Sequence, residues 1–222
     1  MKQRLVFTLA LTFLVKFSYC QIIDRYGINI GTSYSTQIWD YKLVPVDPEN
    51  EYKFGFQVFL QTEKDFGNII ALRTEFGYLQ KGFKNKMTLT FSDGTDACAD
   101  NKNVVLHDLV LNLGLKVKPL DSDYSPYFIV GLRGDYMISY KDIIIEVPES
   151  GLKFNMYEST IEDFNKSNFG GLLGLGIEIK KLIYVEIEYN PNFTNNFDDT
   201  GLNVKDNCWG AKLGLNINKL IE

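Results

Sequence analysis

The chain has 222 residues, of which 45% are hydrophobic and 23% charged, a balance typical of a folded protein and not of a disordered one. Its formal net charge of −5 disfavours nucleic acid as a partner, because an acidic chain repels phosphate backbones. The 13 Tyr and 16 Phe suit half-buried strands and the boundary between water and a membrane.

The first 20 residues have the pattern of a secretory signal peptide. Lys2 and Arg4 precede an apolar run over 5–15, which is too short to span a bilayer. We expect cleavage before Gln21, which leaves residues 21–222 as one domain with 20 basic and 28 acidic residues, a formal charge of −8. A lipoprotein anchor at Cys20 is the alternative, which the bulky residue before it disfavours. Because no later stretch reaches the roughly 18 consecutive apolar residues of a membrane helix, the exported chain can enter a membrane only as a closed barrel.

Period-two alternation of apolar and polar residues recurs eight times along the exported part of the chain. Such alternation places successive side chains on opposite faces of a strand. In the first segment, for example, Ile28 and Ile30 share one face and Asn29 and Gly31 the other. The eight segments are 26–35, 54–61, 70–78, 108–117, 128–136, 169–179, 183–190 and 209–217. They predict an all-β fold, an eight-stranded antiparallel up-and-down transmembrane β-barrel.

The connections between these segments alternate in length. The long ones are 39–52, 82–103, 139–167 and 193–207, and the short ones are 65–67, 119–124 and 180–181. Transmembrane barrels have short periplasmic turns and longer outer loops. With the N-terminus on the periplasmic side, the chain fits this rule with four long outer loops and short periplasmic turns.

The polar face of the strands carries charged residues mixed with many glycines. Glycine weakens a strand on a solvent-facing surface, whereas the interior of an eight-stranded barrel is only just wide enough for side chains. We therefore place the polar face in the lumen and the apolar face in lipid. The alternative is a soluble lipocalin-like barrel, whose apolar face would line a ligand cavity. The predicted lumenal charge network, a structural set of ion pairs, consists of Arg73, Glu75, Asp108, Lys116, Arg133, Asp135, Glu178, Glu186, Glu188 and Lys212.

Five segments resemble the PorT-like outer-membrane β-barrel proteins of Bacteroidetes-type bacteria. They are YGINIGTSYS at 26–35, RTEFGYLQKG at 73–82, SPYFIVGLRGDYMIS at 125–139, FGGLLGLGIEI at 169–179 and VEIEYNPNFTN at 185–195. The resemblance implies the same barrel fold in the outer membrane. Because the family is named for a member linked to a protein secretion system, the resemblance also implies a role in secretion or assembly as an alternative function.

The sequence contains residue types that serve catalysis or metal binding in other proteins, but their positions here favour structural roles. A nucleophilic serine requires a base, but the single histidine, His107, falls on the apolar face, where we expect it to pack at the interface. Glu186 and Glu188 share a face, but lumenal Arg and Lys side chains are their expected partners. The loop acids Asp93, Asp96 and Asp100 lack the dense ligand spacing of an EF-hand. We expect no catalysis, no cofactor and no metal site.

Two cysteines remain after export, Cys98 in the second long loop and Cys208 near the outer end of the last strand. An oxidising compartment permits a disulfide between them, which would tie that loop across the barrel mouth. The long loop 139–167 contains six acidic and three basic residues. The expected function is therefore a non-enzymatic barrel in outer-membrane lipid whose outer loops contact a protein or surface partner.

Overall fold

The computed structural model describes residues 23–43, 50–85, 98–99, 102–146 and 151–218. The predicted signal peptide over 1–20 and the loop acids Asp93, Asp96 and Asp100 lie outside these residues. Within the described ranges, no helix is long and apolar enough to cross a membrane.

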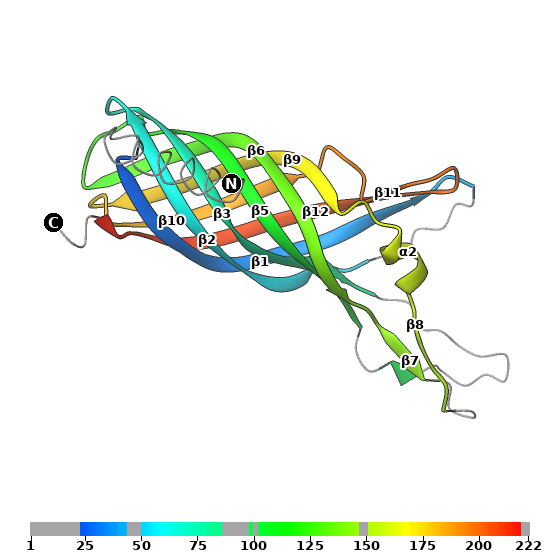
Figure 1. Cartoon of the computed structure of the whole chain (residues 1–222). Helices are drawn as coiled ribbons and strands as arrows, with labels where there is room; N and C mark the ends of the chain where they lie inside the picture. The colour runs from blue at the N-terminus through cyan, green and yellow to red at the C-terminus, as the bar shows by residue number, and fades with distance from the viewer. Residues whose placement is uncertain (1–22, 44–49, 86–97, 100–101, 147–150, 219–222) are drawn as a thin grey trace, which may run out of the picture.

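Eight long antiparallel strands form a closed barrel (Figure 1). The ring closes where β1 pairs with β12, from Gly27 opposite Asn216 to Tyr41 opposite Leu202. The predicted fold class is therefore confirmed. In ring order the strands are β1 (Arg25–Tyr41), β2 (Lys53–Phe66), β3 (Ile70–Lys84), β5 (Asn103–Val117), β6 (Tyr124–Lys141), β9 (Ser167–Ile179), β10 (Ile183–Pro191) and β12 (Leu202–Asn216).

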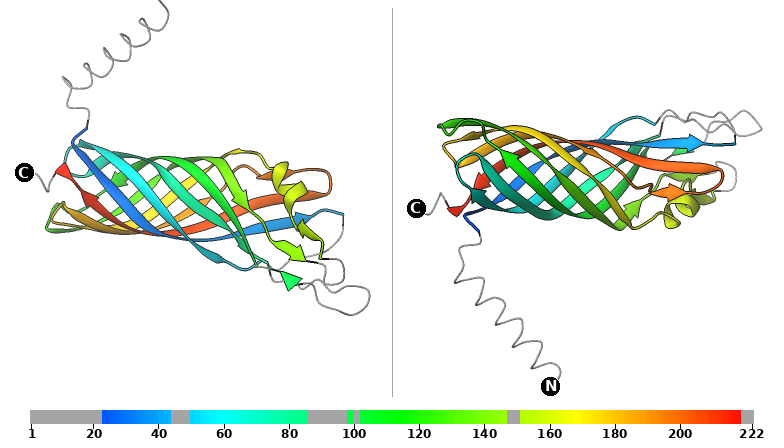
Figure 2. Two further views of the ribbon diagram at one scale, coloured as in Figure 1. Left: turned by 60° about the horizontal axis from the view of Figure 1, so that its bottom comes forward. Right: turned by 90° about the horizontal axis from the view of Figure 1, so that it is seen from above.

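The two ends of the barrel differ. At one end, here called the inner end, β1 begins, β12 ends and short turns join the other strands (Figure 2). At the opposite, outer end the chain forms elements that the alternation did not predict. A small sheet of β4 (Cys98–Ala99), β7 (Ile144–Glu146) and β8 (Lys153–Asn155) projects from the mouth, followed by the short helix α2 (Glu158–Glu162). The two-residue strand β11 (Phe197–Asp198) pairs with the outer part of β12.

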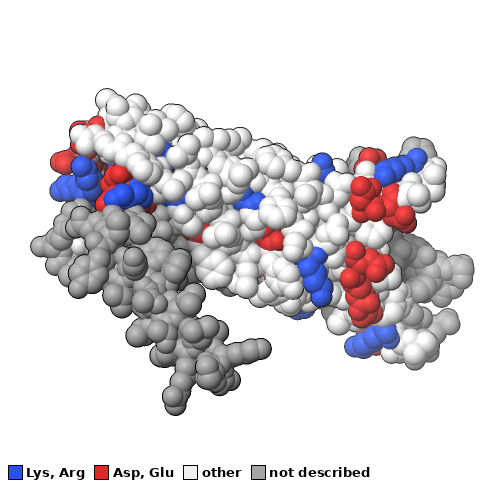
Figure 3. All heavy atoms as spheres, turned by 45° about the horizontal axis from the view of Figure 1, so that its top comes forward, with Lys and Arg blue, Asp and Glu red and all other residues white. Residues whose placement is uncertain are grey.

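The apolar residues of the barrel face outward. Leu111, Leu175 and Ile187 are 53%, 70% and 59% exposed, whereas Arg73 and Glu186 are each 1% exposed. On the face that Figure 3 shows, the result is a wide and mostly uncharged band, with acidic and basic side chains gathered toward the two ends. The alternative of a soluble barrel with an apolar ligand cavity is wrong, because the apolar face lies outside the cylinder.

An aromatic set on the outward face marks the outer limit of this band. The rings of Tyr34 and Tyr52 stack with centroids 4.6 Å apart, and the Tyr189 and Trp209 rings also lie 4.6 Å apart. Beyond Tyr34 the outward positions of β1 soon include a charged residue, Asp40. Aromatic residues at this level are typical of a membrane–water boundary. Since β1 has 17 residues and a tilted membrane strand needs about 9 to 11, the strand continues well past the band.

Candidate functional site

The inner half of the lumen is filled by ion pairs that cross the barrel axis. Arg73 on β3 donates from Nε to Glu63 Oε1 at 2.6 Å and from Nη1 to Glu186 Oε2 at 2.7 Å. Because β3 and β10 stand opposite each other in the ring of eight, the bond to Glu186 spans the lumen. The Arg73 guanidinium also lies 4.6 Å from the ring centroid of Tyr184 and 5.3 Å from that of Tyr127. Cation–π contacts of this kind stabilise a desolvated guanidinium.

Two lysines and a second arginine extend this network to further lumenal carboxylates. Lys212 Nζ lies 2.8 Å from Glu75 Oε2 and 2.6 Å from Glu188 Oε2. Lys116 pairs with Glu63 at 3.2 Å and with Glu178. At the inner end, Arg25 pairs with Glu63 at 2.8 Å and with Glu178 at 3.0 Å. We call these residues the inner charge network, which consists of Arg25, Glu63, Arg73, Glu75, Lys116, Glu178, Glu186, Glu188 and Lys212.

Lumenal glycines leave the room that the aromatic members need. A Cβ added at Gly214 would lie 2.0 Å from Cζ of Tyr184, and one at Gly176 would lie 2.5 Å from Cζ of Tyr127. A Cβ does not approach another atom this closely, so an added side chain would have to displace the ring. The glycines on the polar face of β9 and β12 therefore leave space for two buried tyrosine rings. Both rings lie against the Arg73 guanidinium.

A second group of ion pairs, the outer charge network, lies nearer the mouth. Lys81 Nζ is 2.7 Å from Asp108, 3.0 Å from Asp135 and 2.5 Å from Asp206. Arg133 donates to Asp135 from Nε at 2.7 Å. All five side chains are buried. Two cations thus share three carboxylates in a space closed to water.

The lumen is layered along its axis. On β3 the inward residues follow the order Arg73, Glu75, Gly77, Leu79, Lys81 and Phe83. Leu79 belongs to a thin apolar layer between the two charge networks, formed by Phe59, Leu79, Val110 and Cys208. Phe83 belongs to the mouth cluster, an apolar core at the outer end formed by Trp39, Phe83, Val104, Leu106, Ile143, Ile145, Ile161, Phe164 and Val204.

Comparison with known proteins identifies the class of barrel. Residues 21–198 match the family model described as outer membrane protein beta-barrel domain. The chain belongs to this family. The apolar band is accordingly the surface that this outer-membrane barrel turns toward lipid. Curated proteins compared with the chain give no match.

Solved structures similar to this outer-membrane barrel are themselves bacterial surface or outer-membrane proteins. Ail, the attachment invasion locus protein of Yersinia pestis, is 13% identical with a TM-score of 0.37, covering 86% of this chain and 98% of that one. Neisserial surface protein A is 12% identical with a TM-score of 0.45 (86% and 96% covered). The outer membrane protein OprG from Pseudomonas aeruginosa is 11% identical with a TM-score of 0.40 (86% and 95% covered).

The ten residues of the predicted lumenal charge network all point into the barrel, and none is more than 5% exposed. The structure divides them between the inner and outer networks and adds four charged residues, Arg25, Glu63, Lys81 and Asp206. Each continues the two-residue period beyond a predicted strand end. Extending the alternation from Arg73 and Glu75 through an apolar exception at Leu79 would have reached Lys81.

Cys208 requires a correction. Its thiol is free and 1% exposed, and it packs in the apolar layer inside the barrel. Cys98 belongs to β4, which pairs with β7 in the sheet beyond the mouth. The predicted disulfide is therefore wrong, since Cys208 points into the filled lumen instead of toward the outer loops.

The other residues with catalytic potential are committed to structural contacts. His107 lies on the outward face of β5, where its Nδ1 is hydrogen bonded to the Tyr78 hydroxyl. Glu186 accepts hydrogen bonds from Arg73 and from the Tyr127 hydroxyl at 2.7 Å each, and Glu188 pairs with Lys212. No group of three or more metal-binding side chains occurs in the part of the chain that the structure describes. The lumen is thus built to hold the barrel together, and its charged groups have protein partners.

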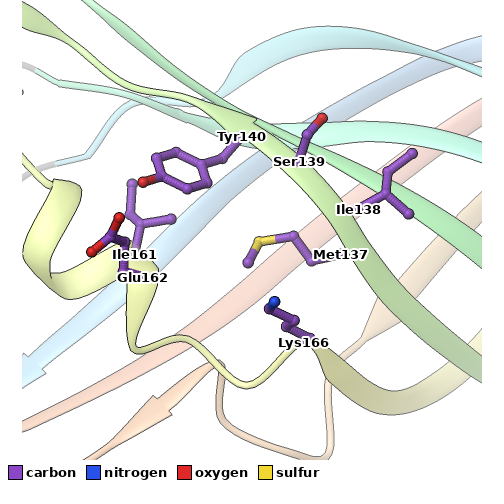
Figure 4. A pocket seen from close by; sticks show the side chains of 7 residues that line it. All are labelled: Met137, Ile138, Ser139, Tyr140, Ile161, Glu162 and Lys166. Atoms are coloured by element: carbon purple, nitrogen blue, oxygen red, sulfur yellow. The ribbon is translucent and has the colours of Figure 1, made fainter.

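The outer mouth offers an accessible surface. A cavity of about 490 Å³ lies between the outer part of β6 and α2. Figure 4 shows Met137 and Tyr140 of β6 extending toward Ile161 of α2. We call this cavity the edge groove, which is lined by Met137, Ile138, Ser139, Tyr140, Ile161, Glu162 and Lys166.

Proposed function

We propose that this outer-membrane barrel is a non-enzymatic surface protein that presents its outer end to a protein partner. The observation that carries the proposal is the mouth cluster. A barrel that only had to cross the membrane would not need strands that continue past the aromatic set and enclose a second apolar core. Burying nine apolar residues there orders the outer segments, and order lowers the entropic cost of binding.

The exposed charges at the outer end favour a protein partner. Glu158, Glu162 and Asp163 all lie exposed on or next to α2. The segment 139–167 as a whole is acidic. Charge of one sign at an accessible surface steers and selects partners of the opposite sign. The filled lumen, with its cross-axis ion pairs, supports this surface mechanically and is not a route for solutes.

The test compares an outer variant with a lumenal one. In the first, residues 151–166 are replaced by a short Gly/Ser linker; in the second, Lys212→Met weakens the inner charge network. Partners are captured from detergent-solubilised membranes and identified by mass spectrometry. We expect the partner to be lost with the outer variant and retained with Lys212→Met in whatever fraction stays folded. Loss with the lumenal variant alone would contradict the proposal.

A second candidate is a barrel subunit of a protein secretion or assembly machine. The five PorT-like segments in the sequence support it, and a docking surface at the outer end suits such a subunit. Under this proposal the barrel acts through contact, because ion pairs fill its lumen. Deleting the gene should block export of other proteins. Normal export in the deletion strain would remove this candidate.

The proposal also includes export through a cleaved signal peptide. The basic start and the short apolar run of residues 1–20 support it. Mass spectrometry of the purified protein should find Gln21 at the N-terminus. A lipidated Cys20 there would contradict cleavage before Gln21 and favour the lipoprotein alternative.

A further inference from the structure

We propose that the edge groove binds an extended segment of a partner protein, which adds as a further strand to the open edge of β6. This inference rests on the proposed function and names its contact site. It concerns residues 138–141, the outermost part of β6.

The open edge follows from the way the two neighbours of β6 end. On one side β6 stays paired with β5 as far as Lys141, which faces Val105. On the other side, pairing with β9 stops at Tyr136, which faces Ser167. Among the residues that the structure describes, no strand pairs with 138–141 on that second side. A strand edge of this kind presents unpaired backbone N–H and C=O groups.

The segment 156–166, which leads from β8 back to β9, does not cover this edge. It is hydrogen bonded on both sides of the gap. Met156 N donates to O of Ile143, just beyond the end of β6, at 2.9 Å, and Met137 N of β6 donates to Lys166 O at 2.8 Å. Between these two bonds it leaves the sheet and forms α2. Ile161 of α2 is anchored in the mouth cluster and is 0% exposed. The helix could cover the edge only by withdrawing this buried side chain from the cluster.

The groove has the dimensions and chemistry for a peptide strand. Four residues of β-strand span about 13 Å, so a short extended segment fits the open edge. Met137, Tyr140 and Ile161 offer apolar contact, and Glu162 and Lys166 are charged. Backbone pairing provides affinity in strand addition, and alternate side chains provide specificity.

The surrounding charge indicates which segment fits best. Glu158, Glu162 and Asp163 are exposed beside the groove. The pKa of Tyr140 is raised, first by desolvation and then by the negative charges of Glu162, Glu158 and Asp142. An extended segment that alternates apolar with basic side chains complements this site. The acyl chain of a lipid is the competing occupant, since Ile138 in the groove lining is apolar and 50% exposed.

The test uses the full-length protein folded in detergent micelles and two fluorescent peptides. One peptide alternates valine with lysine and threonine. The other has the same sequence and charge, but its central backbone nitrogens are N-methylated, so it cannot donate to a strand. We expect saturable binding of the first by fluorescence anisotropy and at least tenfold weaker binding of the second. Hydrogen exchange should show new protection at the amides of 138–141.

Two variants distinguish peptide binding in the groove from non-specific attraction of the basic peptide to the acidic surface. Glu162→Lys should weaken binding of the basic peptide at least threefold, whereas the matched change Asp40→Lys, at an exposed carboxylate on the outer part of β1, should leave it unchanged. Both residues are solvent exposed, so both variants should fold.

Several results would overturn the proposal: no saturable binding, equal binding of the N-methylated peptide, equal effects of the two variants, or protection away from 138–141. Displacement of the peptide by added phospholipid, with no effect of N-methylation, would assign the groove to lipid. If these results appeared while partner capture still depended on 151–166, the proposed function would stand and its contact site would lie elsewhere on the outer end.

Discussion

The two halves of this barrel use opposite arrangements of the same alternating strands. Within the uncharged band, Leu213 of β12 faces outward and Lys212 faces inward. Near the outer end of the same strand, Val204 faces inward at 0% exposed and Lys205 faces outward. We call the outer half, residues 38–41, 82–85, 102–106, 137–146, 151–166 and 196–205, the outer extension.

The difference shows that the surrounding medium decides which face is apolar. Lipid solvates the outward side chains of the band, so the polar groups must find partners in the lumen. Water surrounds the outer extension, so apolar side chains gather inside it as they do in a soluble domain. The two arrangements meet at the outer charge network. The following predictions test this comparison, from the largest expected effect to the smallest.

Removing a central cation of the inner charge network should have the largest effect. Arg73→Met leaves Glu63 and Glu186 buried without their main partner, which we expect to cost about 3–5 kcal/mol. Urea unfolding in micelles, followed by electrophoretic mobility, measures the loss. Combining Arg73→Met with Glu63→Gln and Glu186→Gln should restore much of it. A single variant as stable as the wild type would show that the network does not hold the barrel together.

Truncating the mouth cluster should affect only the outer extension. Ile161→Ala removes a fully buried side chain that anchors α2, at a cost of about 2–5 kcal/mol. Hydrogen exchange should speed up in α2 and its neighbours, while amides of the membrane band keep their protection. Leu43→Ala is the control, because Leu43 is 78% exposed. Loss of protection throughout the barrel would mean that the two halves unfold as one unit.

The same charged substitution should have different effects on the outward faces of the two halves. Leu111 and Ile38 are similarly exposed, at 53% and 56%, but Leu111 lies within the band and Ile38 beside the outward Lys205. In lipid vesicles, Leu111→Arg should cost about 2–4 kcal/mol. Ile38→Arg should cost less than about 0.5 kcal/mol. Equal costs, measured by urea unfolding, would place the membrane boundary elsewhere.

The exposed ion pair between the turns at the inner end should contribute least. Lys181 Nζ lies 2.9 Å from Asp121, and its hydrogen bond and charge lower the pKa of Asp121 below its usual 3.8. Any stabilisation by this pair is therefore present when the pH lies above the usual pKa of Asp121. It is lost as the pH falls through the lowered pKa of the folded protein. We expect Asp121→Asn to leave the urea midpoint at pH 7 unchanged. A shift comparable to that of Arg73→Met would contradict the ranking.

The sequence predicts the membrane band well because one physical rule operates there. Between Ile28 and Thr32, or between Leu111 and Leu115, every second residue meets lipid and the others meet the lumen. The glycines on the polar face already indicate a crowded interior, which Tyr184 opposite Gly214 illustrates.

The same rule does not predict the outer extension, because there apolar side chains face inward and polar ones face outward. Phe83 and Val204 are apolar and point inward, so the alternation no longer separates lipid from lumen. One predicted strand therefore ends before Lys81, and another begins after Asp206. The helix α2 and the β7–β8 hairpin depend on contacts with distant strands, which no local pattern encodes. One example is the ring contact between Tyr157, next to α2, and Trp39 of β1. The disulfide prediction was wrong for the same reason, since it required the direction of Cys208 in three dimensions.

The stacked interior also determines what mutation can do to permeability. Cutting back the outer loops would expose the outer charge network but would not open a pore, because the apolar layer around Leu79 and the cross-axis pair of Arg73 with Glu186 would still block the way. Opening a leak would require several simultaneous replacements, and those in the two charge networks would each leave a buried charge without its partner. The exposed outer surface can therefore diversify under selection without endangering the barrier that surrounds the cell.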